Sequence, residues 1–209
     1  MEIKIKGVRD GGSGEEVDIK ATRHGSLEQS PRLSPGAAIT AKGESWMMMN
    51  TTAIACLVIR PTTVAIVSLW NGEAPGGKSY IIERAFAHCL VTTAAAGFAG
   101  LWLCVHHVGN AALATALAIA GGGCRGVTNY GGNGVFSFAV TVHDDGWFPW
   151  GPGQELPTAG TPGGMMDAEI NGRIIIPPTA AISLSVVGDT TTTTCTAGFH
   201  WHEQVIDLC

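Results

Sequence analysis

A double proline constrains the fold of this chain more than any other feature. Pro177 and Pro178 stand between two β-prone runs, GRIII (172–176) and AISLSVVG (181–188). Proline cannot donate a hydrogen bond to a strand ladder, so it is confined to sheet edges, strand ends and bulges. We therefore expect Pro177 and Pro178 to form a corner, at which one strand ends and the next begins.

Turn signals such as Asn71-Gly72 divide most of the chain into short β-prone runs. About eight strands are expected, which is the number in a jelly roll of two antiparallel sheets. We predict an all-β fold, an antiparallel β-sandwich of the jelly-roll type. One helix is expected, at AALATALAIAGGG (111–123), and one long loop rich in Pro, Gly and aromatic residues, at 143–164.

Charge divides the chain near Ser45. The first 45 residues contain 7 of the 12 Lys and Arg and 7 of the 17 Asp and Glu, and the rest is only about 9% charged. EIKIKG (2–7) and EEVDIKA (15–21) alternate like strands with one buried face, but the segment has too few apolar residues for a core. We predict an extended N-terminal arm over residues 1–45, ordered on a partner, and a jelly-roll domain over residues 46–209.

Composition also bears on partners and compartment. The net charge of −5 argues against nucleic acid, and the uncharged stretch between Arg84 and Arg125 is too rich in Thr, Ala and Gly for a membrane span. The N-terminus shows no secretory signal, so we expect synthesis in a reducing cytoplasm. The cysteines are then expected to be free, and most of them buried: Cys56, Cys89, Cys104, Cys124, Cys195 and Cys209.

Histidines suggest a zinc site that the spacing does not complete. His200 and His202 share one face of a strand, with Glu203 beside them and His106-His107 elsewhere in the chain. No third ligand is fixed by local spacing, and an alternating strand at a wet surface or subunit interface explains the pair. We predict no metal site and no cofactor.

The nucleophile and carboxylate candidates are equally incomplete. Cys104 and His106 share a strand face, but LWLCVHHV is typical of a core strand rather than of a nucleophile loop. Asp144-Asp145, before Gly146, is typical of an Asx turn. We therefore predict no catalytic residues and a protein that is not an enzyme.

Aromatic residues are concentrated in DDGWFPWGPG (144–153). Trp147, Phe148 and Trp150 are expected to lie in an exposed loop and to contact a partner, since aromatic side chains are common anchors at interfaces. The low charge of the body points to large subunit interfaces as well.

Several stretches together resemble one family. RIIIPPTAAISLSVVG (173–188), the closing AGFHWHEQV (197–205), the upstream TTVAIVSLWNGEAPGGKSYIIERAFAHCLV (62–91) and the lead-in GEEVDIKATRHGSLEQSPRL (14–33) are similar to trimeric jelly-roll structural proteins of tailed-bacteriophage virions. The resemblance implies a homotrimeric virion component, made in the host cytoplasm, that binds the major capsid protein or another virion protein. We expect a capsid decoration (cement) protein that functions in viral assembly. The alternatives are a tail or fibre component that contacts host glycan, and a stand-alone lectin-like carbohydrate-binding sandwich.

Overall fold

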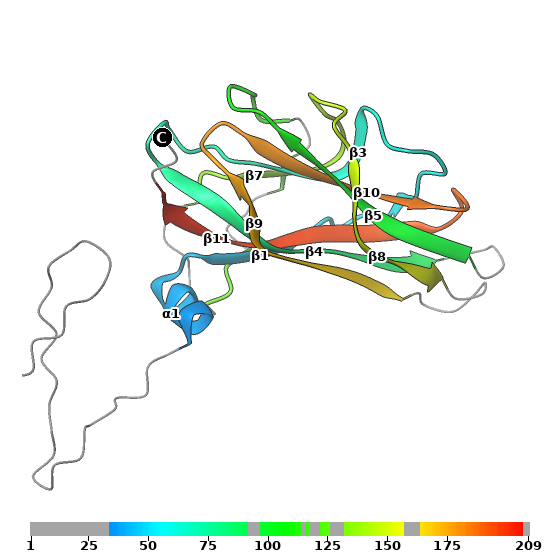
Figure 1. Cartoon of the computed structure of the whole chain (residues 1–209), viewed down its shortest axis with the longest axis horizontal. Helices are drawn as coiled ribbons and strands as arrows, with labels where there is room; N and C mark the ends of the chain where they lie inside the picture. Colours follow the sequence, from blue (N-terminus) through cyan, green and yellow to red (C-terminus); the bar gives the residue numbers. More distant parts are fainter. Residues whose placement is uncertain are drawn as a thin grey trace, which may run out of the picture. The chain divides into compact units, whose positions relative to one another are not determined.

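The computed structural model of the chain describes residues 34–91, 97–113, 116–117, 122–125, 132–156 and 164–206. The chain divides into two compact units, Met1–Ala38 and Ile39–Cys209, and residues 1–33 of the first lie outside the described part. The second unit contains two antiparallel sheets packed face to face (Figure 1). The predicted all-β sandwich is confirmed.

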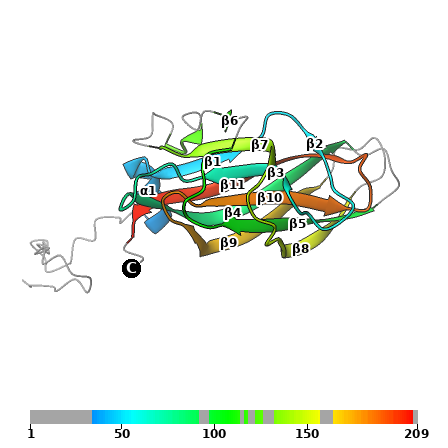
Figure 2. The same ribbon diagram turned by 90° about the horizontal axis from the view of Figure 1, so that it is seen from above.

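Eleven strands make up the two sheets. The first sheet has the order β1 (Ser45–Met49), β11 (Thr194–Val205), β4 (Lys78–Val91), β9 (Met165–Ile176), with β2 (Ile54–Ala55) also paired to β11. The second has the order β6 (Ala116–Leu117), β7 (Val135–Thr141), β3 (Val64–Trp70), β10 (Ala181–Gly188), β5 (Gly97–His106), β8 (Phe148–Leu156). Figure 2 shows β1, β11, β4 and β9 side by side.

The strands pair in a nested order. β1 pairs with β11, β3 with β10, β4 with β9 and β5 with β8. The first strand therefore pairs with the last, and each following pair lies inside the previous one in the sequence. This wrapping of a long antiparallel ribbon into two sheets is the jelly-roll arrangement. β2, β6 and β7 are additions to it, and β7 pairs with β3, where it extends the second sheet.

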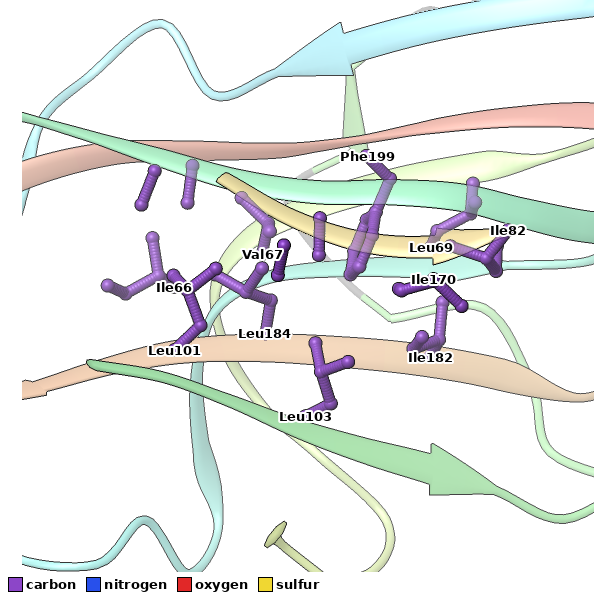
Figure 3. Close-up of a cluster of buried hydrophobic side chains, with 14 of the residues drawn as sticks. Ile66, Val67, Leu69, Ile82, Leu101, Leu103, Ile170, Ile182, Leu184 and Phe199 are labelled. Atoms are coloured by element: carbon purple, nitrogen blue, oxygen red, sulfur yellow. The ribbon is translucent and has the colours of Figure 1, made fainter. Parts of the chain in front are cut away.

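The core between the sheets is built mainly by alternate residues of the strands. On β10 the side chains of Ile182, Leu184 and Val186 enter the core, and on β11 those of Phe199 and Trp201 do so. Figure 3 shows the aliphatic part of this cluster between the two layers. The period of two in the apolar pattern is therefore what fixes each strand's register with respect to the core.

The double proline lies where the chain changes sheets. Pro177 and Pro178 follow β9 of the first sheet and precede β10 of the second. The turn is closed by the Ala180 N–H, which donates to the Pro177 carbonyl, and Thr179 adopts a left-handed φ of 65°. Proline costs no ladder hydrogen bond at this position, because the ladder of β9 has already ended.

Asn71 ties this corner to the strands around it. Its backbone exchanges hydrogen bonds with Thr179 and Ala180, and its buried side-chain amide donates to the carbonyls of Lys78 and Ile176, at 2.9 Å each. The Asn71 side-chain carbonyl accepts from the Glu73 N–H at 3.1 Å. The Asn-Gly signal thus marks a junction of β3, β4, β9 and β10 rather than a two-residue hairpin.

Within the segment predicted to be extended, residues Pro35–Lys42 form a helix, α1. Ser34 caps it by accepting the Ala37 N–H on its hydroxyl and the Ala38 N–H on its carbonyl, Pro35 opens the first turn, and Gly43 ends the helix with a φ of 77°. The prediction of an extended arm is therefore wrong for residues 35–42. The capping residues at both ends stabilise the helix, although it has no apolar stripe. The rest of the predicted arm, 1–33, lies outside the described residues.

Two other local predictions are wrong. Of the expected helix 111–123, residues 111–113 are not helical and Ala116–Leu117 form β6, while 114–115 and 118–121 lie outside the described residues. The expected loop 143–164 contains β8, which pairs with β5. Pro149 and Pro152 disguise this strand, but both are tolerated because β8 is an edge strand.

Candidate functional site: the outer face of the first sheet

Side chains that point away from the sandwich on β1, β11, β4 and β9 lie in rows across the first sheet. One row runs Met49, Gly198, Phe86, Asp167, and the next runs Met47, His200, Arg84, Glu169. Met165 of β9 pairs with His88 in a further row. We call the outer face the set Met47, Met49, Arg84, Phe86, Met165, Asp167, Glu169 and His200.

The outer face exposes flexible apolar side chains. Met47, Met49 and Met165 are 48%, 49% and 55% exposed. Gly198 stands between Met49 and Phe86 in its row, and it has no side chain that would separate them. Methionine adapts its shape to a partner at low cost, and exposed apolar side chains gathered on one face are typical of a binding surface.

The charges on this face are paired with one another. The Arg84 guanidinium lies 3.0 Å from the Asp167 carboxylate and 3.6 Å from that of Glu169. Because these side chains are partly exposed, the pairs contribute little to the stability of the isolated chain. Met and Arg are enriched at protein–protein interfaces, and a guanidinium held in place is ready to form further hydrogen bonds there.

His200 and His202 are held by neighbours rather than by a shared ligand. His200 Nε2 lies 3.1 Å from the Ser45 hydroxyl, and His202 Nδ1 lies 3.0 Å from the Glu83 carboxylate. Burial lowers the pKa of both imidazoles, and the charge of Glu83 opposes this effect. Glu203 points to the opposite face, into the sandwich, so the structure does not bring it to the two histidines. In the described part of the chain no group of three or more His, Cys, Asp or Glu could hold a metal ion.

Glu203 is a carboxylate enclosed by aromatic rings. It lies opposite Tyr80, and the indoles of Trp46 and Trp201 stack at 6.3 Å beside it. Both carboxylate oxygens, the Tyr80 hydroxyl and the two indole N–H groups make no hydrogen bond of ordinary geometry within the described residues, and the indoles only partly oppose the effect of burial on Glu203. Burial raises the pKa of Glu203 to about 7, although Lys78 Nζ, 3.8 Å away, opposes the rise.

A second polar cluster lies on the outer side of the second sheet. His106 Nε2 is 2.8 Å from the Ser183 hydroxyl and His106 Nδ1 is 3.3 Å from the Asp144 carboxylate, the order of groups in a nucleophilic triad. These residues come from β10, β5 and the segment after β7. Cys104 Sγ lies 3.9 Å from the same Nδ1.

The hydrogen bonds of this cluster oppose nucleophilic chemistry. The Asp144 backbone N–H donates to His106 Nδ1, so in the neutral ring Nε2 carries the proton and donates to Ser183. The Ser183 hydroxyl in turn donates to Ser68 at 3.0 Å, away from the imidazole. His106 and Ser183 are fully buried, and burial and Asp144 raise the pKa of Cys104 to about 11. The arrangement stabilises the packing of β3, β5 and β10 and leaves no activated nucleophile.

The three predicted contact residues have packing partners within the chain. Trp147 is 5% exposed, packs in a small cluster on the second sheet, and donates its indole N–H to the Thr62 carbonyl at 2.7 Å. Phe148 and Trp150 begin β8 and pack against the main core, and the Trp150 indole N–H donates to the Glu169 carbonyl on β9. Their contact with a partner stays a prediction; the structure shows that Trp150 connects β8 to β9, the edge strands of the two sheets.

Apart from His200, the residues of the outer face were not singled out from the sequence. The signal was present in the alternation of MMDAEI on β9, where every second residue is exposed, and in Met47 and Met49 of β1, which alternate with the less exposed Met48. Within the described residues no helix is long and apolar enough to cross a membrane. Comparison with known protein families, with curated proteins and with solved structures gives no match to this chain.

Proposed function

We propose that this protein is a non-enzymatic structural component of a tailed-phage particle, a homotrimer that binds and stabilises the capsid as a decoration protein. The observation that carries the proposal is the outer face, which combines half-exposed methionines with ion-paired Arg84 on a jelly-roll sheet. Its composition is that of a surface covered by another protein. The assignment to a phage particle rests on the similarity of residues 14–33, 62–91, 173–188 and 197–205 to phage jelly-roll proteins.

The outer face is proposed as the contact with other subunits. Met49 and Met165 are well separated on β1 and β9, so charges introduced at both positions would oppose burial across the whole sheet. An unpaired buried charge costs several kcal/mol, enough to abolish a weak contact. The N-terminal segment, with its 7 basic and 7 acidic residues, would add further contacts, and three-fold association multiplies their effect.

Co-sedimentation with particles that lack the protein tests the proposal. The full chain should sediment stoichiometrically with such particles and should have three times the chain mass by light scattering. Met49→Glu with Met165→Glu should abolish both properties. The control is Ile59→Glu, which places the same charge at a 70% exposed position away from the outer face and should change neither. A monomer that ignores capsids would overturn the proposal and turn attention to glycans or a tail partner.

A further inference from the structure

Three cysteine side chains meet inside the sandwich. Cys195 Sγ on β11 lies 2.8 Å from Cys89 Sγ on β4 and 3.2 Å from Cys56 Sγ, which follows β2. All three are free thiols and at most 1% exposed. They are more than thirty positions apart in sequence, so only the fold brings them together.

The backbone at Cys89 and Cys195 suits a covalent bridge. The two residues are directly opposite in the antiparallel pair of β4 and β11. The Cys89 N–H donates to the Gly164 carbonyl, beside β9, and therefore points away from β11. Opposite residues whose N–H groups point away from each other have Cα atoms about 4.5 Å apart. Disulfides span about 4.4–6.8 Å between Cα atoms, so this pair needs little strand movement, although the ladder is irregular between Thr194 and Cys195.

Cys56 lies beside the Cys195 sulfur but does not take part in the bridge. Its N–H donates to the Thr193 carbonyl at 2.9 Å, which fixes it next to the start of β11. It does not lie opposite Cys195 in a strand pair, because Cys195 is paired there with Ile54. After a bond forms between the other two, one reduced thiol remains in the cluster.

We propose that Cys89 and Cys195 form an oxidation site, at which a peroxide converts the two thiols into a disulfide between β4 and β11. The first thiol attacks the peroxide, the O–O bond breaks, and a sulfenic acid and one water form. The second thiol then attacks the sulfenic sulfur, the S–S bond forms, and a second water leaves. The sulfurs lose two electrons to the peroxide, and the two thiol protons end in the waters.

The cluster also affects the reactivity of its thiols. Hydrogen bonds from Cys195 and Cys56 lower the pKa of Cys89, whereas hydrogen bonding to its two neighbours and burial raise the pKa of Cys195. Burial makes the reaction slower than that of exposed Cys124, because the oxidant reaches the sulfurs only when the strands open.

The test uses the full chain carrying Cys124→Ser and Cys209→Ser, which retains four cysteines. Hydrogen peroxide is added, thiols are counted after denaturation, and unreduced peptides are mapped by mass spectrometry. We expect the titratable thiols to fall from four to two, with a link between residues 89 and 195. Adding Cys104→Ser should leave the link intact, whereas adding Cys195→Ser should leave no disulfide, because the sulfenic acid then has no thiol opposite it on β11.

Two results would overturn the proposal: four thiols that survive prolonged exposure to excess peroxide, or a link that involves Cys56 or Cys104. If the Cys195→Ser chain does not fold, the link mapped in the chain that retains four cysteines still decides the question. The oxidised four-cysteine chain should melt several degrees higher than the reduced one, because the bridge restricts the unfolded chain. Dithiothreitol should reverse the change.

Discussion

Replacing Glu203 by Gln removes a buried charge and should make the protein less sensitive to alkaline pH. The carboxyl is fully buried beside the indoles of Trp46 and Trp201, and its pKa is raised to about 7 from an ordinary value of 4.5. The folded state therefore favours the protonated acid, whereas the unfolded chain ionises it easily. The stabilisation by the proton is complete below about pH 4.5 and is lost as the pH rises through 7.

The size of the effect follows from the two pKa values. Each pKa unit corresponds to about 1.4 kcal/mol, so ionised Glu203 costs the folded state about 3 kcal/mol above pH 8. Gln has nearly the same shape and stays neutral. The free energy of unfolding of E203Q minus that of the parent should therefore rise by about 3 kcal/mol between about pH 4.5 and pH 8.5.

Urea unfolding followed by tryptophan fluorescence at both pH values measures this difference. The buried imidazoles of His106, His200 and His202 have lowered pKa values, so their contribution is lost as the pH falls below 6.5, but both proteins contain them and they cancel. Glu155→Gln, on the exposed edge strand β8, is the control and should change stability by less than about 0.5 kcal/mol. An E203Q difference that is the same at both pH values would refute the reasoning.

Three further substitutions test the packing by the same unfolding measurement. Asn71→Ala should cost about 3 kcal/mol or more, because three buried hydrogen bonds of its side chain are lost; a cost below about 1 kcal/mol would show that the corner does not depend on it. Gly198→Ala should cost more than about 2 kcal/mol, because the new methyl group would collide with the Met48 carbonyl, whereas Gly100→Ala, which has room, should cost less than about 1 kcal/mol. Equal effects at the two glycines would contradict this close approach of β1 to β11. Ser183→Ala should cost about 1–3 kcal/mol by leaving His106 Nε2 without a partner, and a neutral result would mean that the network is not satisfied as described.

Much of the strand content could be predicted because each strand carries its own local signal. The β-prone runs GRIII and AISLSVVG lie in β9 and β10. The proline-rich β8 and the capped helix α1 were missed because composition was weighed above capping and edge position, although Ser34, Pro35 and Gly43 mark α1 plainly. The alanine-rich 111–123 was misleading, since Ala and Leu at every second position fit a strand as well as a helix.

The clusters of side chains could not be predicted, because each joins residues that only the nested pairing brings together. Ser183, His106 and Asp144 are drawn from three distant segments, and so are the three thiols. The sequence showed Cys104 and His106 on one strand face, which the structure bears out, but not the backbone N–H of Asp144 that fixes the imidazole's proton. Similarly, composition predicted an exposed loop at Trp147, whereas the fold buries this side chain and its indole N–H donates to the Thr62 carbonyl.

The pairing of β1 with β11 also sets when folding can finish. Ser45 pairs with His202, and Trp46 pairs with Trp201. The two ends of the described β domain must therefore come together, although nearly all of the domain's sequence lies between them. β11 is the central neighbour of β1, β2 and β4, and without it the first sheet has no continuity. During synthesis, most of the domain therefore leaves the ribosome before its first strand has a partner. Folding should be slow and dominated by distant contacts, and chains cut short before β11 should aggregate rather than form a partial domain.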